Sequence, residues 1–119
     1  MIKLKRVYEP ISVTDGERIL VDRLWPRGIR HSTSNIDIWV KNVAPSKELR
    51  KWYAHDPKKW MGFKKRYKKE LDGNNALNKL IQIVQNADPV TFLYSARDNR
   101  HNNAVVLLDV VKKRMKTKA

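Results

Sequence analysis

Two short, uninterrupted apolar runs in the chain predict two buried strands. Residues 18–24 contain a consecutive Ile-Leu-Val triplet, and residues 90–95 read Val-Thr-Phe-Leu-Tyr-Ser. A short continuous apolar run between turn residues is typical of a strand covered on both faces. Residues 2–8 alternate between apolar and basic side chains, which indicates a strand at or near the edge of a sheet.

Between these runs, apolar residues recur at helical spacing. Asn35 is expected to cap a short helix over residues 36–43, and Ser46 is expected to cap a second short helix. The pair Asp56–Pro57 is a stronger start signal, because aspartate suits the N-cap and proline suits the first helical position. The helix that it opens carries an apolar stripe opposite its lysines: Trp60, Phe63, Tyr67 and Leu71.

Two further helices are predicted after the break at residues 73–74. Asn75 is expected to cap the first of them, which ends before Pro89. Residues 102–115 form the second. Their Val-Val-Leu-Leu-Asp-Val-Val core also has the β-branched residues of a strand, but the length of the segment and its apolar spacing favour a helix.

Strands that alternate with helices predict an α/β fold. The 119 residues suit a single small three-layer domain, in which a short, mainly parallel sheet is flanked by helices. We assign residues 1–111 to this domain and residues 112–119 to a basic C-terminal tail.

Several classes of protein and site are not expected. No apolar run reaches the roughly 20 residues of a membrane span, and the first residues lack the apolar core of a signal peptide, so we expect a cytoplasmic protein. The chain has no cysteine and its three histidines are scattered, which argues against disulfides, thiol chemistry and a metal site. It also lacks a Gly-rich phosphate loop, so no cofactor is predicted.

Charge is concentrated in two places. The formal net charge is +14, from 26 basic and 12 acidic residues. A basic helix with a basic tail attracts nucleic acid through its phosphates without sequence specificity, although a solvated surface explains the same pattern. The helix bases are Lys58, Lys59, Lys64, Lys65, Arg66, Lys68 and Lys69, and those of the tail are Lys112, Lys113, Arg114, Lys116 and Lys118.

The loops after the two buried runs are rich in arginine, aspartate and histidine. Ligands of open α/β sheets bind beyond the carboxyl ends of the strands, and arginine binds phosphate or carboxylate there. Two carboxylates and a histidine add acid–base chemistry near neutral pH. We predict a cleft with Asp22, Asp98 and His101 as catalytic residues, and with Arg23, Arg27, Arg97, Trp25 and Asn102 as anion-binding residues.

Each of these residues also has a structural interpretation. Asp22 and Arg23 suit an ion pair that closes the end of a strand. Asp98 suits the N-cap of the last helix. A lone histidine such as His101 is more often a hydrogen-bonded structural residue than a general base.

Motifs along almost the whole chain carry a family resemblance. They read RVYEP, DGERILVDRLWPRG, APSKELRKWYAHDPKKW, FKKRYKKEL and VTFLYSARDNRHNNAVVL. In this order and spacing, over about residues 4–110, they resemble the YeaO-like branch of the domain-of-unknown-function 488 family. The resemblance implies a small α/β fold without an agreed activity.

The family's motif positions fall on residues of the predicted cleft. They correspond to Asp22, Arg23, Trp25, Pro26, Arg27 and Gly28, to Asp56 and Pro57, and to Arg97, Asp98, His101 and Asn102. Longer relatives carry a cysteine motif at the place of residues 95–103, and many short relatives have a second histidine where this chain has Asn103. Thiol chemistry and a two-histidine site are therefore not expected here.

These observations give two function hypotheses. The first is a strand-end cleft that binds an anionic small molecule, a nucleotide or phosphorylated metabolite, with hydrolysis or group transfer left open. The alternative is a nucleic-acid-associated protein that uses the basic helix and tail. A structural subunit recruited through its surface is a third interpretation without a motif of its own. The sequence does not fix the substrate or the oligomeric state.

Overall fold

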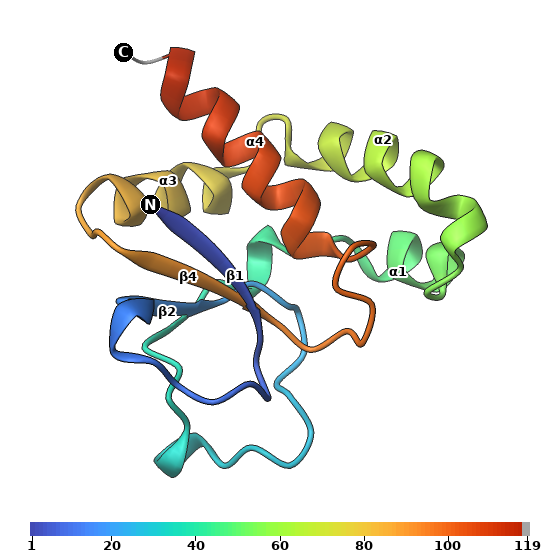
Figure 1. The fold of residues 1–119 in the computed structure, drawn as a ribbon. Coiled ribbons are helices and arrows are strands. Elements are labelled where there is room, and N and C mark those ends of the chain that lie inside the picture. The colour runs from blue at the N-terminus through green and yellow to red at the C-terminus, as the bar shows by residue number, and fades with distance from the viewer. Residues whose placement is uncertain (118–119) are drawn as a thin grey trace.

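The computed structural model describes residues 1–117, which form one parallel sheet and a layer of helices (Figure 1). The strands are β1 (Ile2–Arg6), β2 (Glu17–Leu20), β3 (Ile38–Trp39) and β4 (Val90–Tyr94). The helices are α1 (Lys47–Tyr53), α2 (Trp60–Leu71), α3 (Asn75–Gln85) and α4 (Asn103–Thr117). Short 3-10 turns are η1 (Val13–Asp15), η2 (His31–Thr33), η3 (Lys41–Val43) and η4 (Pro57–Lys59).

The sheet has the order β1-β4-β2-β3, and every neighbouring pair of its strands is parallel. β4 lies between β1 and β2, and all five of its residues are buried. The predicted α/β class, the mainly parallel sheet and the edge position of the first strand are confirmed.

The two faces of the sheet are covered differently. Helices α1 to α4 share one hydrophobic core with one face, in which Ile19 and Phe92 are fully buried. On the second face, Leu20 and Leu93 pack beneath Trp25, Trp39 and neighbouring isoleucines. The second face is thus covered by loops and 3-10 turns, while the helices lie together on the first (Figure 1). Loops therefore take the place of the third layer that the sequence predicted.

The predicted helix over residues 36–43 is wrong. Residues 38–39 form β3, which pairs with β2 through the partners Ile19–Ile38 and Leu20–Trp39, and the 3-10 turn η3 follows. Asp37 anchors this pairing, because its backbone N–H donates to the carbonyl of Arg18 (2.8 Å) and its carboxylate accepts from the Arg18 N–H (2.8 Å). Long-range pairing therefore overrides the local helical spacing.

The other helix starts agree closely with the sequence. Ser46 caps α1 by accepting a hydrogen bond from the Leu49 N–H (3.1 Å). Asp56 caps the turn η4, directly before α2, through the Lys58 N–H (3.0 Å). The cap of α3 is Asn74 rather than Asn75, since the Asn74 side chain accepts from two N–H groups of the first turn.

The last apolar segment is a helix, as its length indicated. α4 continues to Thr117, so the described part of the basic tail extends this helix. Lys118 lies outside the described residues. No helix within residues 1–117 is both long and apolar enough to cross a membrane.

Gly16 is required where the chain turns into β2. Its φ is +64°, and an added Cβ would lie 2.0 Å from the carbonyl oxygen of Pro89. Gly73 has a similar φ of +77°, but an added Cβ there meets nothing within 4 Å. The two glycines share a positive φ, but only Gly16 also lies against another part of the backbone.

We expect Gly73→Ala to lower the free energy of unfolding by about 1–2 kcal/mol, the cost of a left-handed alanine. Gly16→Ala should lower it by about 1–3 kcal/mol more, because the backbone of Pro89 must also move. Urea denaturation of both variants measures this difference. Equal losses would show that the close approach of Gly16 to Pro89 is unimportant.

Candidate functional site

Asp22 lies where β2, β4 and the start of α4 meet. Its carboxylate accepts hydrogen bonds from the backbone N–H (2.9 Å) and the hydroxyl (2.8 Å) of Ser95. The amide of Asn103 donates to the carbonyl of Val21 (3.2 Å). The ends of the two predicted buried strands are therefore adjacent and joined through this carboxylate.

The pKa of Asp22 is raised above its usual value. Burial disfavours the charged carboxylate and outweighs the hydrogen bonds from Ser95 and Asn103 and the charge of Arg50, which act in the opposite direction. A raised pKa of this kind occurs both at catalytic carboxylates and at buried structural ones.

Asp98 organises the turn before α4. It accepts hydrogen bonds from the N–H groups of Arg100 (2.9 Å) and His101 (3.0 Å) and contacts the ring nitrogen Nδ1 of His101 (2.8 Å). The hydrogen bonds from the Arg100 N–H and the His101 side chain lower the pKa of Asp98. The backbone carbonyl of His101 accepts a hydrogen bond from the Tyr53 hydroxyl (3.1 Å). The imidazole ring of His101 lies edge-on to the ring of Trp60.

Asn102 has a capping role that the sequence analysis gave to Asp98. Its side chain accepts from the Val105 N–H (3.1 Å) in the first turn of α4 and donates to the Asp98 carbonyl (2.9 Å). These contacts give Asp98 and Asn102 a structural role at the start of α4. Catalysis by Asp98 and His101 and anion binding by Asn102 stay predictions.

The predicted anion-binding arginines have different surroundings. The guanidinium of Arg23 donates to the carbonyls of Ala44 (3.1 Å) and Pro45 (3.2 Å) rather than to Asp22, so the expected ion pair is not formed. Arg27 and Arg97 are both exposed.

Trp25 belongs to the second face of the sheet. Its ring stacks on His31 with 3.6 Å between ring centroids, and its Nε1 donates to the Ile29 carbonyl (2.6 Å). Within residues 1–117, no hydrogen bond, ion pair or ring contact links residues 25–27 to residues 98–101. The structure thus brings together Asp22 and the start of α4, but not every residue of the predicted cleft.

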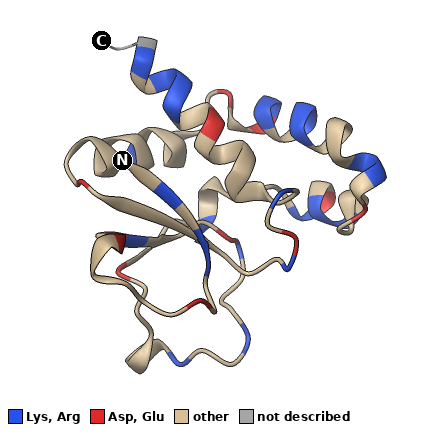
Figure 2. Cartoon of the chain, in the orientation of Figure 1, with Lys and Arg blue, Asp and Glu red and all other residues tan. Residues whose placement is uncertain are grey.

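Lys and Arg recur along α2 (Figure 2), and their side chains, together with that of Lys59 in the turn η4, contact both α1 and α4. Towards α1, Lys59 and Arg66 lie over the ring of Trp52, at 5.2 and 4.0 Å from its centroid. Towards α4, Lys68 is 3.2 Å from the carboxylate of Asp109. The basic side chains between residues 58 and 69 are therefore divided between contacts with α1 and contacts with α4.

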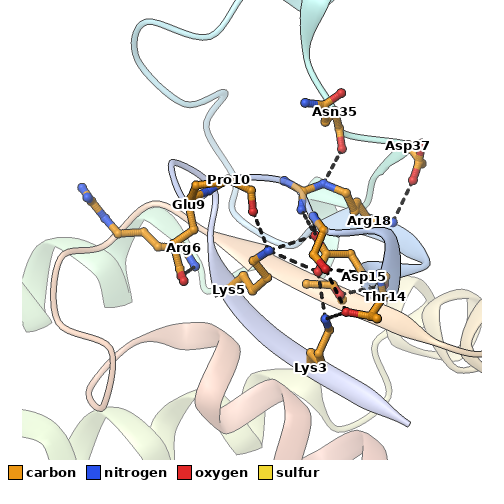
Figure 3. A network of polar contacts seen from close by, with 12 residues as sticks. Lys3, Lys5, Arg6, Glu9, Pro10, Thr14, Asp15, Arg18, Asn35 and Asp37 are labelled. Atoms are coloured by element: carbon orange, nitrogen blue, oxygen red, sulfur yellow. Dashed lines mark hydrogen bonds and ion pairs between the residues drawn. The ribbon is translucent and has the colours of Figure 1, made fainter.

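A charged cluster that the sequence analysis missed surrounds Asp15 (Figure 3). Asp15 is only 1% exposed and pairs with Lys3 (2.9 Å), Lys5 (3.0 Å) and Arg18. Burial by itself would raise the pKa of Asp15, but hydrogen bonds from these cations and from the Ser12 N–H hold it well below its usual range.

Part of this cluster had a sequence signal. The alternation in residues 2–8 places Lys3 and Lys5 on the same face of a strand, where one acidic partner can reach both. Nothing local identifies Asp15 as that partner, because Asp15–Gly16 has the composition of an ordinary turn. Among the described residues, no group of three histidine or acidic side chains is arranged to hold a metal ion.

Comparisons with known proteins agree with these motifs. The family model DUF488-N3i, described as "Inactive DUF488-N3 subclade", matches residues 1–119. The uncharacterized protein YeaO of Escherichia coli K12 is 42% identical over 108 residues, which cover 91% of this chain and 94% of that protein. The uncharacterized protein Rv3073c of Mycobacterium tuberculosis H37Rv is 42% identical over 110 residues, 92% of each chain. No solved structure matches the chain.

The raised pKa of Asp22 predicts a pH-dependent effect of Asp22→Asn. In the wild type, a folded-state pKa above the unfolded value of about 3.9 favours folding at low pH, and this contribution is lost as pH rises through the folded pKa. Asparagine keeps an acceptor for Ser95, and because it does not ionise, its contribution to stability does not fall as pH rises. The stability of Asp22→Asn relative to the wild type should therefore increase between about pH 3 and pH 6.

Urea denaturation of both proteins at a series of pH values measures this difference. Asp22→Ala serves as the control for the lost acceptor, because it leaves the Ser95 N–H without a partner and should be less stable than Asp22→Asn throughout. A difference between wild type and Asp22→Asn that does not vary with pH would contradict the raised pKa.

Proposed function

The chain belongs to the DUF488-N3i family, described as the inactive DUF488-N3 subclade, and on that premise we propose that it binds a partner rather than catalyses a reaction. The partner that we propose is the phosphate backbone of nucleic acid. Its binding site is the α2–α4 basic surface, which consists of Lys64, Lys65, Lys68, Lys112, Lys113 and Lys116.

The contact of two lysines with one carboxylate carries this proposal. Lys68 of α2 and Lys113 of α4 lie 3.2 and 3.3 Å from the same oxygen of Asp109. Bases that are 45 positions apart in the sequence are thus neighbours on one surface. Asp109 offsets only part of their charge.

Helical spacing adds the other members of the surface. Lys64 and Lys65 precede Lys68 by four and three positions, and Lys112 and Lys116 flank Lys113 on α4, so each group follows one side of its helix. Both helices contact each other and pack on the same face of the sheet (Figure 2). Six ammonium groups on two adjacent helices provide the repeated positive charge that a polyphosphate chain requires.

The surroundings of the tryptophans favour binding without base recognition. Arg66 and Lys59 cover Trp52, and Lys64 lies over Trp60 at 5.7 Å from the ring centroid. Single-stranded nucleic acid is recognised by bases that stack on free aromatic faces. Occupied ring faces therefore favour contacts with phosphates in either a DNA or an RNA duplex.

The binding should depend steeply on salt. With six phosphates neutralised, the logarithm of the association constant for duplex DNA should fall with the logarithm of salt concentration with a slope of about −5. Lys65→Gln combined with Lys112→Gln should reduce this slope by about 2 and weaken binding at low salt. Fluorescence anisotropy with a labelled 20-base-pair DNA and the matching RNA measures both quantities.

The double variant Lys47→Gln and Lys51→Gln is the matched control. It removes the same charge from exposed positions of α1, outside the α2–α4 basic surface. We expect it to change the slope little. Equal effects of the two double variants would show that binding depends only on the net charge of the protein and not on this surface. No binding at about 50 mM salt would refute the proposal.

A small anion at the strand ends is a second proposed function, favoured by Arg50. The Nε atom of Arg50 is buried and has no hydrogen-bond partner among the described residues. The charge of Arg50 also lowers the pKa of Asp22, which indicates that the two are close. An anion bound at the strand ends would be attracted by Arg50, by the exposed Arg97 and by the first turn of α4.

For this second proposal we expect adenosine monophosphate to raise the melting temperature of the wild type at about 0.3 M salt, where weak surface attraction is screened. Arg97→Ala should abolish the increase. Arg100→Ala, an exposed arginine of the same turn, should keep it. An unchanged melting temperature of the wild type would refute a strand-end nucleotide site.

A further inference from the structure

A cavity of about 420 Å³ lies on the second face of the sheet, away from the α2–α4 basic surface. Its volume is within the range of roughly 300–1,000 Å³ that is common for small-molecule sites. It opens between the end of β1 and residues 28–36. Its polar lining includes Glu9, Arg18, Arg30, Thr33, Ser34 and Asn35.

Arg18 is a buried cation in the wall of this cavity. It is 4% exposed; its Nε donates to the Asn35 carbonyl (2.7 Å), and its Nη1 contacts the carboxylate of Asp15. A guanidinium has five N–H donors, so these two contacts leave further donors for a ligand. In Figure 3 the second Nη atom of Arg18 points away from both partners.

With Arg30 and Glu9 of the lining included, the groups around Arg18 comprise four cations and three carboxylates, which leaves one positive charge in excess. Lys3, Lys5 and Arg18 share the single carboxylate of Asp15. Asp37 adds a second carboxylate, which accepts from the Arg18 backbone N–H. Electrostatic attraction is weakly screened in a buried setting, so the attraction of an anion to Arg18 would depend less on salt than attraction to an exposed arginine.

The opposite wall offers groups for hydroxyls. Glu9 lines the cavity, and one of its oxygens accepts from the Arg6 N–H (2.6 Å), which leaves the other oxygen as an acceptor. Thr33 and Ser34 add hydroxyl groups, and the exposed Arg30 adds a second guanidinium. The lining thus combines cations for an anionic head group with acceptors for ligand hydroxyls.

We propose that this cavity binds a polyhydroxylated organic anion, with its phosphate or carboxylate at Arg18 and Arg30 and its hydroxyls at Glu9, Thr33 and Ser34. The site does not depend on the proposed nucleic-acid binding, because it uses none of the lysines of α2 and α4. It is also separate from the strand-end residues 97–101, none of which lines it.

Isothermal titration calorimetry with ribose 5-phosphate and with gluconate tests the proposal and distinguishes a phosphate head group from a carboxylate. We expect at least one of them to bind, and uncharged ribose to bind at least about tenfold more weakly. Arg30→Ala should weaken the anion at least about fivefold. Arg100→Ala should have no effect, because Arg100 is an exposed arginine that does not line the cavity.

The role of Arg18 is tested in the wild-type protein, because a substitution of Arg18 would also remove its ion pair with Asp15. In the wild type, the Nε–Hε NMR signal of Arg18 should shift saturably with the bound anion, at the calorimetric affinity. The proposal is overturned if neither anion binds, if Arg100→Ala acts like Arg30→Ala, or if the shifts appear at Arg97 and His101 instead. The last result would support the strand-end site, and none of the three affects the proposed nucleic-acid binding.

Discussion

The fold depends on one buried carboxylate. Asp15 bonds to two lysines of β1 and to Arg18 of β2, and its backbone carbonyl accepts from the Thr91 hydroxyl of β4 (2.7 Å). A single residue before β2 thus contacts three parallel strands. Because buried charges are costly unless they are paired, this arrangement opposes any shift of register among these strands.

The same cluster explains why the two faces of the sheet differ. Lys3, Lys5 and Arg18 occupy part of the second face, so a helix with an apolar stripe cannot cover that part, and loops cover it instead. All four helices of the described residues pack on the opposite face. The apolar sides of α2 and α4 face the core, so the lysines on their other sides lie towards solvent. The molecule therefore has an exposed cationic surface that salt screens and a buried cation that salt affects less.

The candidate strand-end site was only partly predictable. β2 and β4 are neighbouring parallel strands, so their ends lie at the same edge of the sheet, as the predicted cleft requires. The side-chain partners were not predictable. Arg23 binds backbone carbonyls about 20 positions away, and Trp25 stacks on His31 over the second face. Such contacts depend on how loops fold back over the sheet, and sequence pattern carries little information on that.

The sequence by itself determined the features that depend on neighbouring residues: the buried runs of β2 and β4, the cap at Ser46, and the apolar stripe that made residues 102–115 a helix. These follow from periodicity and backbone chemistry over a few positions. Only the tertiary structure decided that residues 38–39 form a strand and that Asp15 is the shared partner of two lysines. Both outcomes arise from contacts between distant segments, whose combined energy exceeds the weak local preferences of the chain.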